Sequence, residues 1–303
     1  MSFQDGTPLD VCYGYLFEQL TKLNRSAEVV DDTNVLQEAN PVILKILDDM
    51  LIDTLLPGSC IAGVENAKEF LNAVKSGKRG LILMEHYSNF DLPGFSYLMR
   101  KSGIPELEEI AARTVAIAGM KLSEENPMIS AWASAYSRVI IYPSRSLASI
   151  ADPEERAIEE HRSRKINMAS MRALDNVRKQ GKILLVFPAG TRFRKNKPET
   201  KKGVREIDSY IRLSDVMLPI AVNGNCLRIS EKFPTNMIKD EIWHDKMVYT
   251  AGKMIECKPF RKAIQDSLSE DLEDKKQPVV DEIMNILEKL HIEAEKTRNA
   301  PAN

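Results

Sequence analysis

The stretch Leu81-Ile-Leu-Met-Glu-His-Tyr-Ser-Asn-Phe-Asp91 carries the strongest structural signal in the chain. An apolar run followed by a polar turn is typical of a buried strand, and Pro93 suits the first turn of a helix. We therefore expect His86 where a strand ends and Asp91 where a helix begins. At this spacing the carboxylate can accept a hydrogen bond from one ring N–H, which leaves the other ring nitrogen free as a base. The same residues also fit a non-catalytic turn histidine beside a helix-start aspartate.

A second stretch, Ile183-Leu-Leu-Val-Phe-Pro-Ala-Gly-Thr-Arg-Phe-Arg194, repeats this pattern of an apolar strand that runs into a turn. Arginine, here Arg192 and Arg194, presents a planar fork of donors that matches phosphate oxygens. A solvated loop and a nucleic-acid patch are the alternatives, but the net charge of −2 and the single interleaved aromatic, Phe193, argue against nucleic acid as a partner. A small phosphorylated ligand fits better. The basic run continues through Lys195, Lys197, Lys201 and Lys202.

Two further segments also begin with an apolar strand. They are Val139-Ile-Ile-Tyr-Pro-Ser-Arg145 and Val216-Met-Leu-Pro-Ile-Ala-Val222. With His86-x4-Asp91 and Phe187-Pro-Ala-Gly-Thr-Arg192, they follow the order of the four sequence blocks of the glycerolipid acyltransferases. The chain resembles that family over residues from about 80 to about 225. The co-occurrence of four blocks in order is far more specific than any one block.

Within that family, the chain is most similar to the soluble glycerol-3-phosphate acyltransferases of the plastid type. Those enzymes also place a tyrosine and a basic residue in the second block, here Tyr142 and Arg145, ahead of an acidic segment, here Asp152-Pro-Glu154. Like them, the chain lacks the glutamate that most membrane relatives have in the third block. The departures from the family pattern are Ala189 in place of that glutamate, Ser146 where plastid-type enzymes usually have histidine, and Tyr87 where glutamine or arginine is preferred.

The resemblance implies a glycerol-3-phosphate 1-O-acyltransferase of phospholipid biosynthesis that uses acyl-CoA or acyl-ACP as co-substrate, with no other cofactor and no metal. His86 would remove the proton from the attacking hydroxyl while Asp91 holds the ring. The residues that would bind the substrate phosphate are Arg145, Arg192 and Arg194. Candidate substrate or oxyanion contacts are Ser88, Gly190 and Thr191.

Three other functions fit parts of the same pattern. An acyltransferase that uses 1-acylglycerol 3-phosphate as acceptor is the nearest, although such relatives usually have membrane-embedded segments. A non-catalytic homologue that binds lipid or acyl carrier is a second alternative, to which Ala189 gives some room. The third is a metal hydrolase with His86 and Asp91 as ligands, and it lacks plausible third and fourth ligands nearby.

Composition favours a soluble, cytoplasmic enzyme. Hydrophobic residues make up 43% of the chain and charged residues 28%, and the four cysteines have no metal-site spacing. The first residues lack the basic and apolar regions of a secretory signal. The chain has no run of about 18 uncharged apolar residues, which is the length a helix needs to span a bilayer. A membrane surface is also an expected partner, contacted transiently as the lysophosphatidate product leaves.

From Gly77 onward, apolar strands alternate with helices, which predicts an α/β fold with a mixed central sheet flanked by helices. We expect an α/β acyltransferase domain at residues 76–303, after a small helical N-terminal domain at residues 1–75. The apolar spacing predicts helices at residues 9–23 and 41–56 within the N-terminal domain.

Two more helices are expected in the second domain. Asp152 and Pro153 form a helix start, and Gly181 a helix stop. A final helix at residues 278–297 has one apolar face and should pack on the sheet. Among the remaining histidines, His161 lies between charged residues and should face solvent, whereas the others have no suggestive neighbours in the sequence. Those others are His244 and His291.

Overall fold

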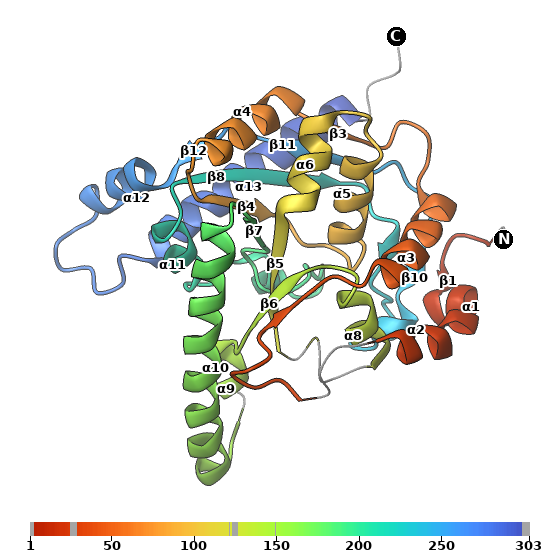
Figure 1. The fold of residues 1–303 in the computed structure, drawn as a ribbon, viewed down its shortest axis with the longest axis horizontal. Coiled ribbons are helices and arrows are strands. Elements are labelled where there is room, and N and C mark those ends of the chain that lie inside the picture. Colours follow the sequence, from red (N-terminus) through yellow and green to blue (C-terminus); the bar gives the residue numbers. More distant parts are fainter. Residues whose placement is uncertain (1–2, 25–28, 121, 123–126, 149, 299–303) are drawn as a thin grey trace.

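A computed structural model shows an α/β molecule built on one large mixed sheet (Figure 1), so the predicted fold class is confirmed. Within the described residues this sheet has nine strands, in the order β2-β6-β5-β7-β4-β8-β11-β3 with β12 also paired to β8. Its strands are β2 (Leu36–Gln37), β3 (Cys60–Ala62), β4 (Gly80–Met84), β5 (Thr114–Gly119), β6 (Arg138–Ile141), β7 (Ile183–Val186), β8 (Val216–Asn223), β11 (Val248–Ala251) and β12 (Ile255–Glu256). The residues described are 3–24, 29–120, 122, 127–148 and 150–298.

The centre of the sheet is parallel. Strands β6, β5, β7, β4 and β8 all run in the same direction, so their carboxyl ends meet at one edge. Parallel sheets are stable when helices cover both faces, and β4, β7 and β8 are buried along their whole length. This arrangement brings the segments that follow the central strands to a common edge.

Two helical layers cover the sheet, and alternate residues of β4 belong to different sides of it. Ile82 and Met84 join one apolar core, whereas Leu81 and Leu83 join the other. Helices of the first layer are α3 (Pro41–Thr54), α4 (Val64–Lys75), α5 (Asp91–Arg100), α6 (Pro105–Arg113) and α8 (Pro127–Ala133). Helices of the second are α10 (Pro153–Lys179), α11 (Ile207–Arg212), α12 (Cys257–Asp266) and α13 (Gln277–Arg298).

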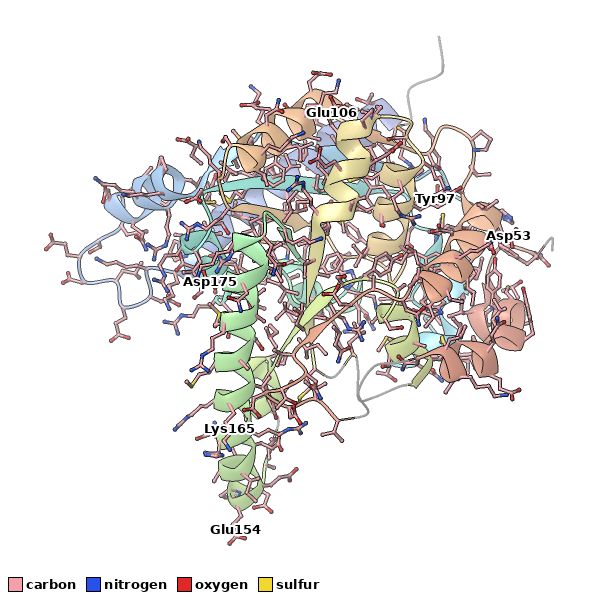
Figure 2. The ribbon with its side chains drawn as sticks, in the orientation of Figure 1. Asp53, Tyr97, Glu106, Glu154, Lys165 and Asp175 are labelled. Carbon is pink, nitrogen blue, oxygen red and sulfur yellow. The ribbon has the colours of Figure 1, made fainter. Side chains whose placement is uncertain are left out.

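The two long helices of the second layer agree with the sequence predictions. At the start of α10, the side chain of Asp152 accepts the backbone N–H of Glu154 at 2.9 Å, and Gly181 beyond its end has a φ of +71°. Figure 2 shows the first half of α10 projecting from the body, with Glu154 at its tip. His161 on this helix is exposed. Helix α13 packs on β8, as expected of the final helix.

The predicted continuous helix at residues 9–23 is wrong. The chain instead forms α1 (Leu9–Tyr13), a 3₁₀ turn at Gly14–Leu16, and α2 (Phe17–Leu23). Glycine has a low helical propensity, because its backbone loses the most freedom on ordering. The break therefore falls at Gly14, and the apolar stripe still faces the core through Leu9 and Leu20.

The N-terminal region belongs to the same sheet and the same apolar core as the rest of the chain. Strands β2 and β3 belong to the main sheet, and the apolar side of α3 lies in the same core as α5. Near the amino terminus, β1 (Thr7–Pro8) pairs with β10 (Glu241–Ile242), which in turn pairs with β9 (Leu227–Arg228). The domain boundary between residues 75 and 76 stays a prediction.

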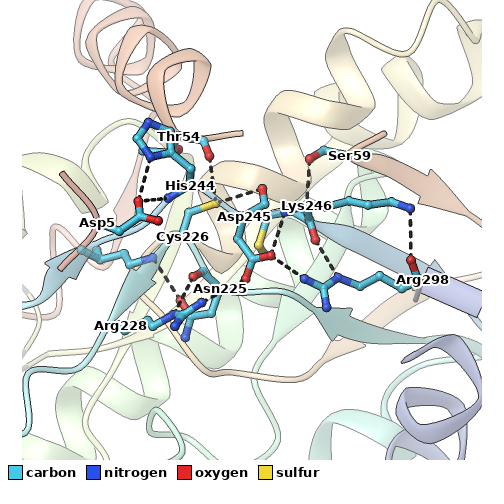
Figure 3. Close-up of polar contacts among 12 residues, drawn as sticks. Asp5, Thr54, Ser59, Asn225, Cys226, Arg228, His244, Asp245, Lys246 and Arg298 are labelled. Atoms are coloured by element: carbon cyan, nitrogen blue, oxygen red, sulfur yellow. Dashed lines mark hydrogen bonds and ion pairs between the residues drawn. The ribbon is translucent and has the colours of Figure 1, made fainter. Parts of the chain in front are cut away.

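A polar cluster fixes the end of α13 to the loops beside β8 and β11 (Figure 3). Arg298 forms an ion pair with Asp245 and donates to the backbone oxygen of Lys246 at 2.8 Å. In the same cluster Asp245 accepts the backbone N–H of Asn225 at 2.9 Å. The last turn of α13 is thereby held in place. None of the helices in the described part of the chain has both the length and the apolar character needed to cross a membrane.

Candidate active site

Two loops lie side by side at the carboxyl edge of the sheet, because β4 and β7 are parallel neighbours. We call residues 85–91 the β4 turn and residues 187–202 the β7 loop. Phe193 of the β7 loop donates its backbone N–H to the backbone oxygen of His86 at 2.8 Å. The segment after β6 is farther away, since β5 lies between β6 and β7. The structure thus brings the first and third sequence blocks into direct contact.

The β4 turn holds His86 and Asp91 in hydrogen-bond contact. Nδ1 of His86 lies 2.9 Å from Oδ2 of Asp91. The same carboxylate oxygen accepts the backbone N–H groups of Tyr87 at 2.6 Å and Ser88 at 2.8 Å. Asp91 is fully buried, whereas the His86 side chain keeps 16% of its surface exposed. Because Nδ1–H of His86 donates a hydrogen bond to Asp91, Nε2 of His86 remains as the basic nitrogen.

The imidazole of His86 is also held from the side. Its ring stacks on Phe187, with 3.9 Å between ring centroids and 16° between ring planes. The turn itself is closed by Ser88, whose buried hydroxyl accepts the backbone N–H of Phe90 at 2.8 Å. Ser88 also accepts the backbone N–H of Asp91 through its carbonyl at 3.2 Å. The hydroxyl of Ser88 therefore shapes the turn, and its expected contact with substrate stays a prediction.

Gly190 and Thr191 form the start of the β7 loop. Gly190 has a φ of +60°, a left-handed conformation that residues with a side chain rarely adopt. Its N–H donates to the backbone oxygen of Phe187 at 2.8 Å. This N–H is therefore engaged within the turn, and the expected contact of Gly190 with the substrate or the oxyanion stays a prediction. Thr191 is half-buried beside it, and its role stays a prediction.

Arg192 lies deeper than a phosphate-binding residue on a surface loop would. The side chain is only 6% exposed, and its Nη1 forms an ion pair with the buried carboxylate of Asp240. Burial raises the pKa of Asp240 to about 6, although the charge of Arg192 opposes this rise. The partner of Arg192 comes from 48 residues farther along the chain. Part of the guanidinium is thus engaged within the protein.

Arg194 is the more accessible of the two arginines. Its side chain is half-buried and makes no hydrogen bond or ion pair among the described residues, although its charge acts on Asp240 from a distance. Its backbone is held by Thr200, whose hydroxyl accepts the Arg194 N–H at 2.8 Å. Arg145 lies in the short helix α9 (Ser144–Ala148), and its side chain is outside the part of the structure that is described.

The sequence did not point to a second polar network that adjoins the β4 turn. Glu85 is buried and accepts three hydrogen bonds, from the Tyr87 hydroxyl at 2.8 Å, the Val222 backbone N–H at 2.9 Å and Nδ1 of His291 at 2.8 Å. Burial and the nearby charge of Glu85 raise the pKa of Tyr87, so its hydroxyl stays protonated and donates. The only sequence signal was the position of Glu85 directly before His86, because His291 lies 206 residues away.

The described residues contain no group of three or more histidine, cysteine, aspartate or glutamate side chains placed to hold a metal ion. At the β4 turn, the His86–Asp91 pair lies beside the basic β7 loop. Such a pair can take a proton from a hydroxyl group, and the guanidinium of Arg194 can bind an anion.

A comparison with protein families agrees with this arrangement. The sequence model of the family described as Acyltransferase matches residues 61–223, more than half of the chain. This range contains the β4 turn, the β7 loop and the second and fourth sequence blocks. Among curated proteins, none matches the chain.

Proposed function

The chain belongs to the acyltransferase family, and we propose that it is a glycerol-3-phosphate 1-O-acyltransferase. The single observation that carries the proposal is the contact between the β7 loop and the β4 turn at His86. A base that would take a hydroxyl proton and arginines that would hold a phosphate are thereby placed on adjoining segments. Glycerol 3-phosphate carries both groups in one small molecule.

The chemical step is a direct transfer. Nε2 of His86 removes the proton from the 1-hydroxyl of glycerol 3-phosphate while that oxygen attacks the carbonyl carbon of an acyl thioester. A carbon–oxygen bond forms, and the tetrahedral intermediate then breaks its carbon–sulfur bond. The thiolate leaves and takes the proton back from the imidazolium. Asp91 keeps the ring in the required tautomer and stabilises its charged form.

The phosphate of the acceptor is assigned to Arg194 first and to Arg192 second. The Arg194 guanidinium has no hydrogen-bonded partner among the described residues, whereas Arg192 already pairs with Asp240. An anchored phosphate converts the attack into an intramolecular-like step, which is a major source of rate enhancement. Arg145 remains a third candidate for this contact.

The donor is proposed to be acyl-CoA or the acyl form of an acyl carrier protein, both of which are acidic. Three lysines of the β7 loop are exposed and offer a positive rim to such a donor. They are Lys195, Lys197 and Lys202. Lys201 belongs to the same run but forms an ion pair with Glu288.

An acceptor assay tests the proposal. The protein is incubated with a labelled acyl-CoA or a labelled acyl-ACP and, in turn, with glycerol 3-phosphate, 1-acylglycerol 3-phosphate or glycerol. We expect rapid acylation of glycerol 3-phosphate and very slow acylation of glycerol, which lacks the phosphate. Preferential acylation of 1-acylglycerol 3-phosphate would reassign the acceptor, and no transfer to any acceptor from acyl-CoA or acyl-ACP would overturn the proposal.

A further inference from the structure

The network behind the β4 turn joins three elements that are distant in sequence. Glu85 stands at the end of β4, Val222 in β8 and His291 in α13, and all three meet at one buried carboxylate. A buried carboxylate is costly unless its oxygens are hydrogen-bonded. Here Oε1 accepts from Tyr87 while Oε2 accepts from both Val222 and His291. The Glu85 carboxylate is therefore held in place by three hydrogen bonds, directly before His86, the proposed base, in the chain.

Helix α13 reaches the β7 loop as well. Glu288, one turn before His291, forms an ion pair with Lys201, and the Lys201 ammonium lies 5.7 Å from the centre of the Phe193 ring. Phe193 in turn packs edge-on against Tyr87. One face of α13 therefore touches both the β4 turn and the β7 loop.

The helix is itself well anchored at this point. The side-chain amide of Asn223 donates to the backbone oxygen of His291 at 3.2 Å and to Glu295 at 2.7 Å. The end of α13 is held by Arg298 in the cluster of Figure 3. Because Asn223 and Arg298 hold α13 in place, His291 on this helix can hold the Glu85 side chain in a defined position.

We propose that Glu85 and His291 are positioning residues of the acyl transfer, which hold the β4 turn and the β7 loop at a fixed separation through α13. This inference rests on the function proposed above. The pair does not touch the reacting atoms. It acts through Glu85, whose neighbour His86 is the proposed base, and through Tyr87, which packs against Phe193 between the two arginines.

The strength of this contact depends on the charge of His291. Burial lowers the pKa of His291, but the hydrogen bond and the charge of Glu85 raise it by more, so the net shift is upward. Of the other charged groups that face it, Glu288 on α13 also raises this pKa, whereas Lys201 of the β7 loop lowers it. Tyr87, on the β4 turn, stays neutral. A raised histidine pKa means that the contact is strongest at low pH and weakens as pH rises through that pKa.

The pH profile of kcat/KM for glycerol 3-phosphate tests the proposal. In the wild type, activity should fall, giving a falling limb, as pH rises through the raised pKa of His291 and the contact with Glu85 weakens. His291→Gln can keep a hydrogen bond to Glu85 but cannot carry charge. We expect this variant to lose the falling limb and to lower kcat about 10- to 100-fold, the scale of effect of a misplaced catalytic group.

Two further variants complete the experiment. Glu85→Gln should also remove the falling limb, and it serves if His291→Gln does not fold. His244→Gln is the matched control, because His244 also pairs with a carboxylate, Asp5, at 2.7 Å, and its side chain stacks on Phe3 rather than contacting α13. The control should keep the wild-type profile. A falling limb that persists in both site variants, or an unchanged kcat in both, would overturn the proposal.

A second measurement does not require activity. Amide hydrogen exchange of peptides that cover the β4 turn and the β7 loop should accelerate at least about tenfold in His291→Gln, since weakened local contacts increase opening. The His244→Gln control should leave both peptides unchanged. If the wild type acylates no acceptor, the proposed function fails, yet this measurement still decides the positioning role. Unchanged exchange in both loops would reject it.

Discussion

The β4 turn and the β7 loop lie in contact, yet they are held in different ways. In the β4 turn, Asp91 accepts three hydrogen bonds from residues that precede it by five positions or fewer. In the β7 loop, Arg192 pairs with Asp240, and Lys201 pairs with Glu288, which is 87 residues away. The His86–Asp91 pair is therefore held by local contacts, whereas the β7 loop takes its shape from the rest of the fold.

This difference governs how a substitution in each segment should act. A side chain whose partners are local can be removed without disturbing distant parts of the chain, so the effect should appear in the chemistry. A side chain with a buried distant partner leaves that partner unsatisfied when it is removed, so the effect should appear in stability. Variants of the two segments can therefore separate catalysis from folding.

His86→Ala should give the largest effect. Removal of the base is expected to lower kcat about 10²- to 10⁴-fold, because general-base catalysis typically contributes that much. The β4 turn should survive, since Asp91 still accepts the backbone N–H groups of Tyr87 and Ser88. Steady-state kinetics and thermal unfolding of the same preparation measure both quantities. A kcat within threefold of the wild type would remove His86 from the mechanism.

The two arginines of the β7 loop should differ in kind. Arg192→Ala leaves the buried Asp240 carboxylate without its cation, and breaking such a pair typically costs about 3–5 kcal/mol of unfolding free energy. The pKa of Asp240 is already raised by burial, and loss of Arg192 should raise it further. A neutral carboxyl needs no cation, so the loss of stability should be smaller at pH 5 than at pH 8. Urea unfolding of the wild type and of Arg192→Ala at the two pH values measures this loss of unfolding free energy.

Arg194→Ala should instead change substrate binding. A charge-assisted hydrogen bond is worth about 1.5–3 kcal/mol, which corresponds to a rise of about 10- to 150-fold in the KM for glycerol 3-phosphate. The urea midpoint should stay at the wild-type value, because this guanidinium has no ion-pair partner among the described residues. For the unfolding measurement on Arg192→Ala, the control is the double variant Arg192→Ala/Asp240→Asn, which should recover much of the unfolding free energy that Arg192→Ala loses. A normal KM in Arg194→Ala would remove that residue from phosphate binding.

The same contrast explains what could be predicted from the sequence. The α/β fold, both long helices and the contact between His86 and Asp91 follow from short-range patterns: apolar periodicity, helix caps and a turn of fixed length. The buried pairing of Arg192 and the junction at Glu85 could not be predicted, because their partners approach only when distant strands and helices pack. The sequence likewise did not show that the N–H of Gly190 closes its own turn.

A smaller effect is expected one turn into the helix that follows the β4 turn. A Cβ atom at Gly94 of α5 would lie 2.3 Å from the Tyr249 hydroxyl, which is buried and donates to the backbone oxygen of Phe90 at 3.4 Å. Gly94→Ala should therefore destabilise the fold by about 1–3 kcal/mol through overpacking. Gly14→Ala is the matched control, since nothing lies within 4 Å of its Cβ position and its φ of −55° suits alanine.

Gly14→Ala should be neutral or should stabilise the protein by up to about 1 kcal/mol, because alanine restricts the unfolded chain. Urea unfolding of the two variants in parallel makes the comparison. If Gly94→Ala also lowers kcat without a change in KM, the start of α5 contributes to the alignment of Asp91 as well as to packing. Equal unfolding free energies for Gly94→Ala and the wild type would show that the Tyr249 side chain can move aside.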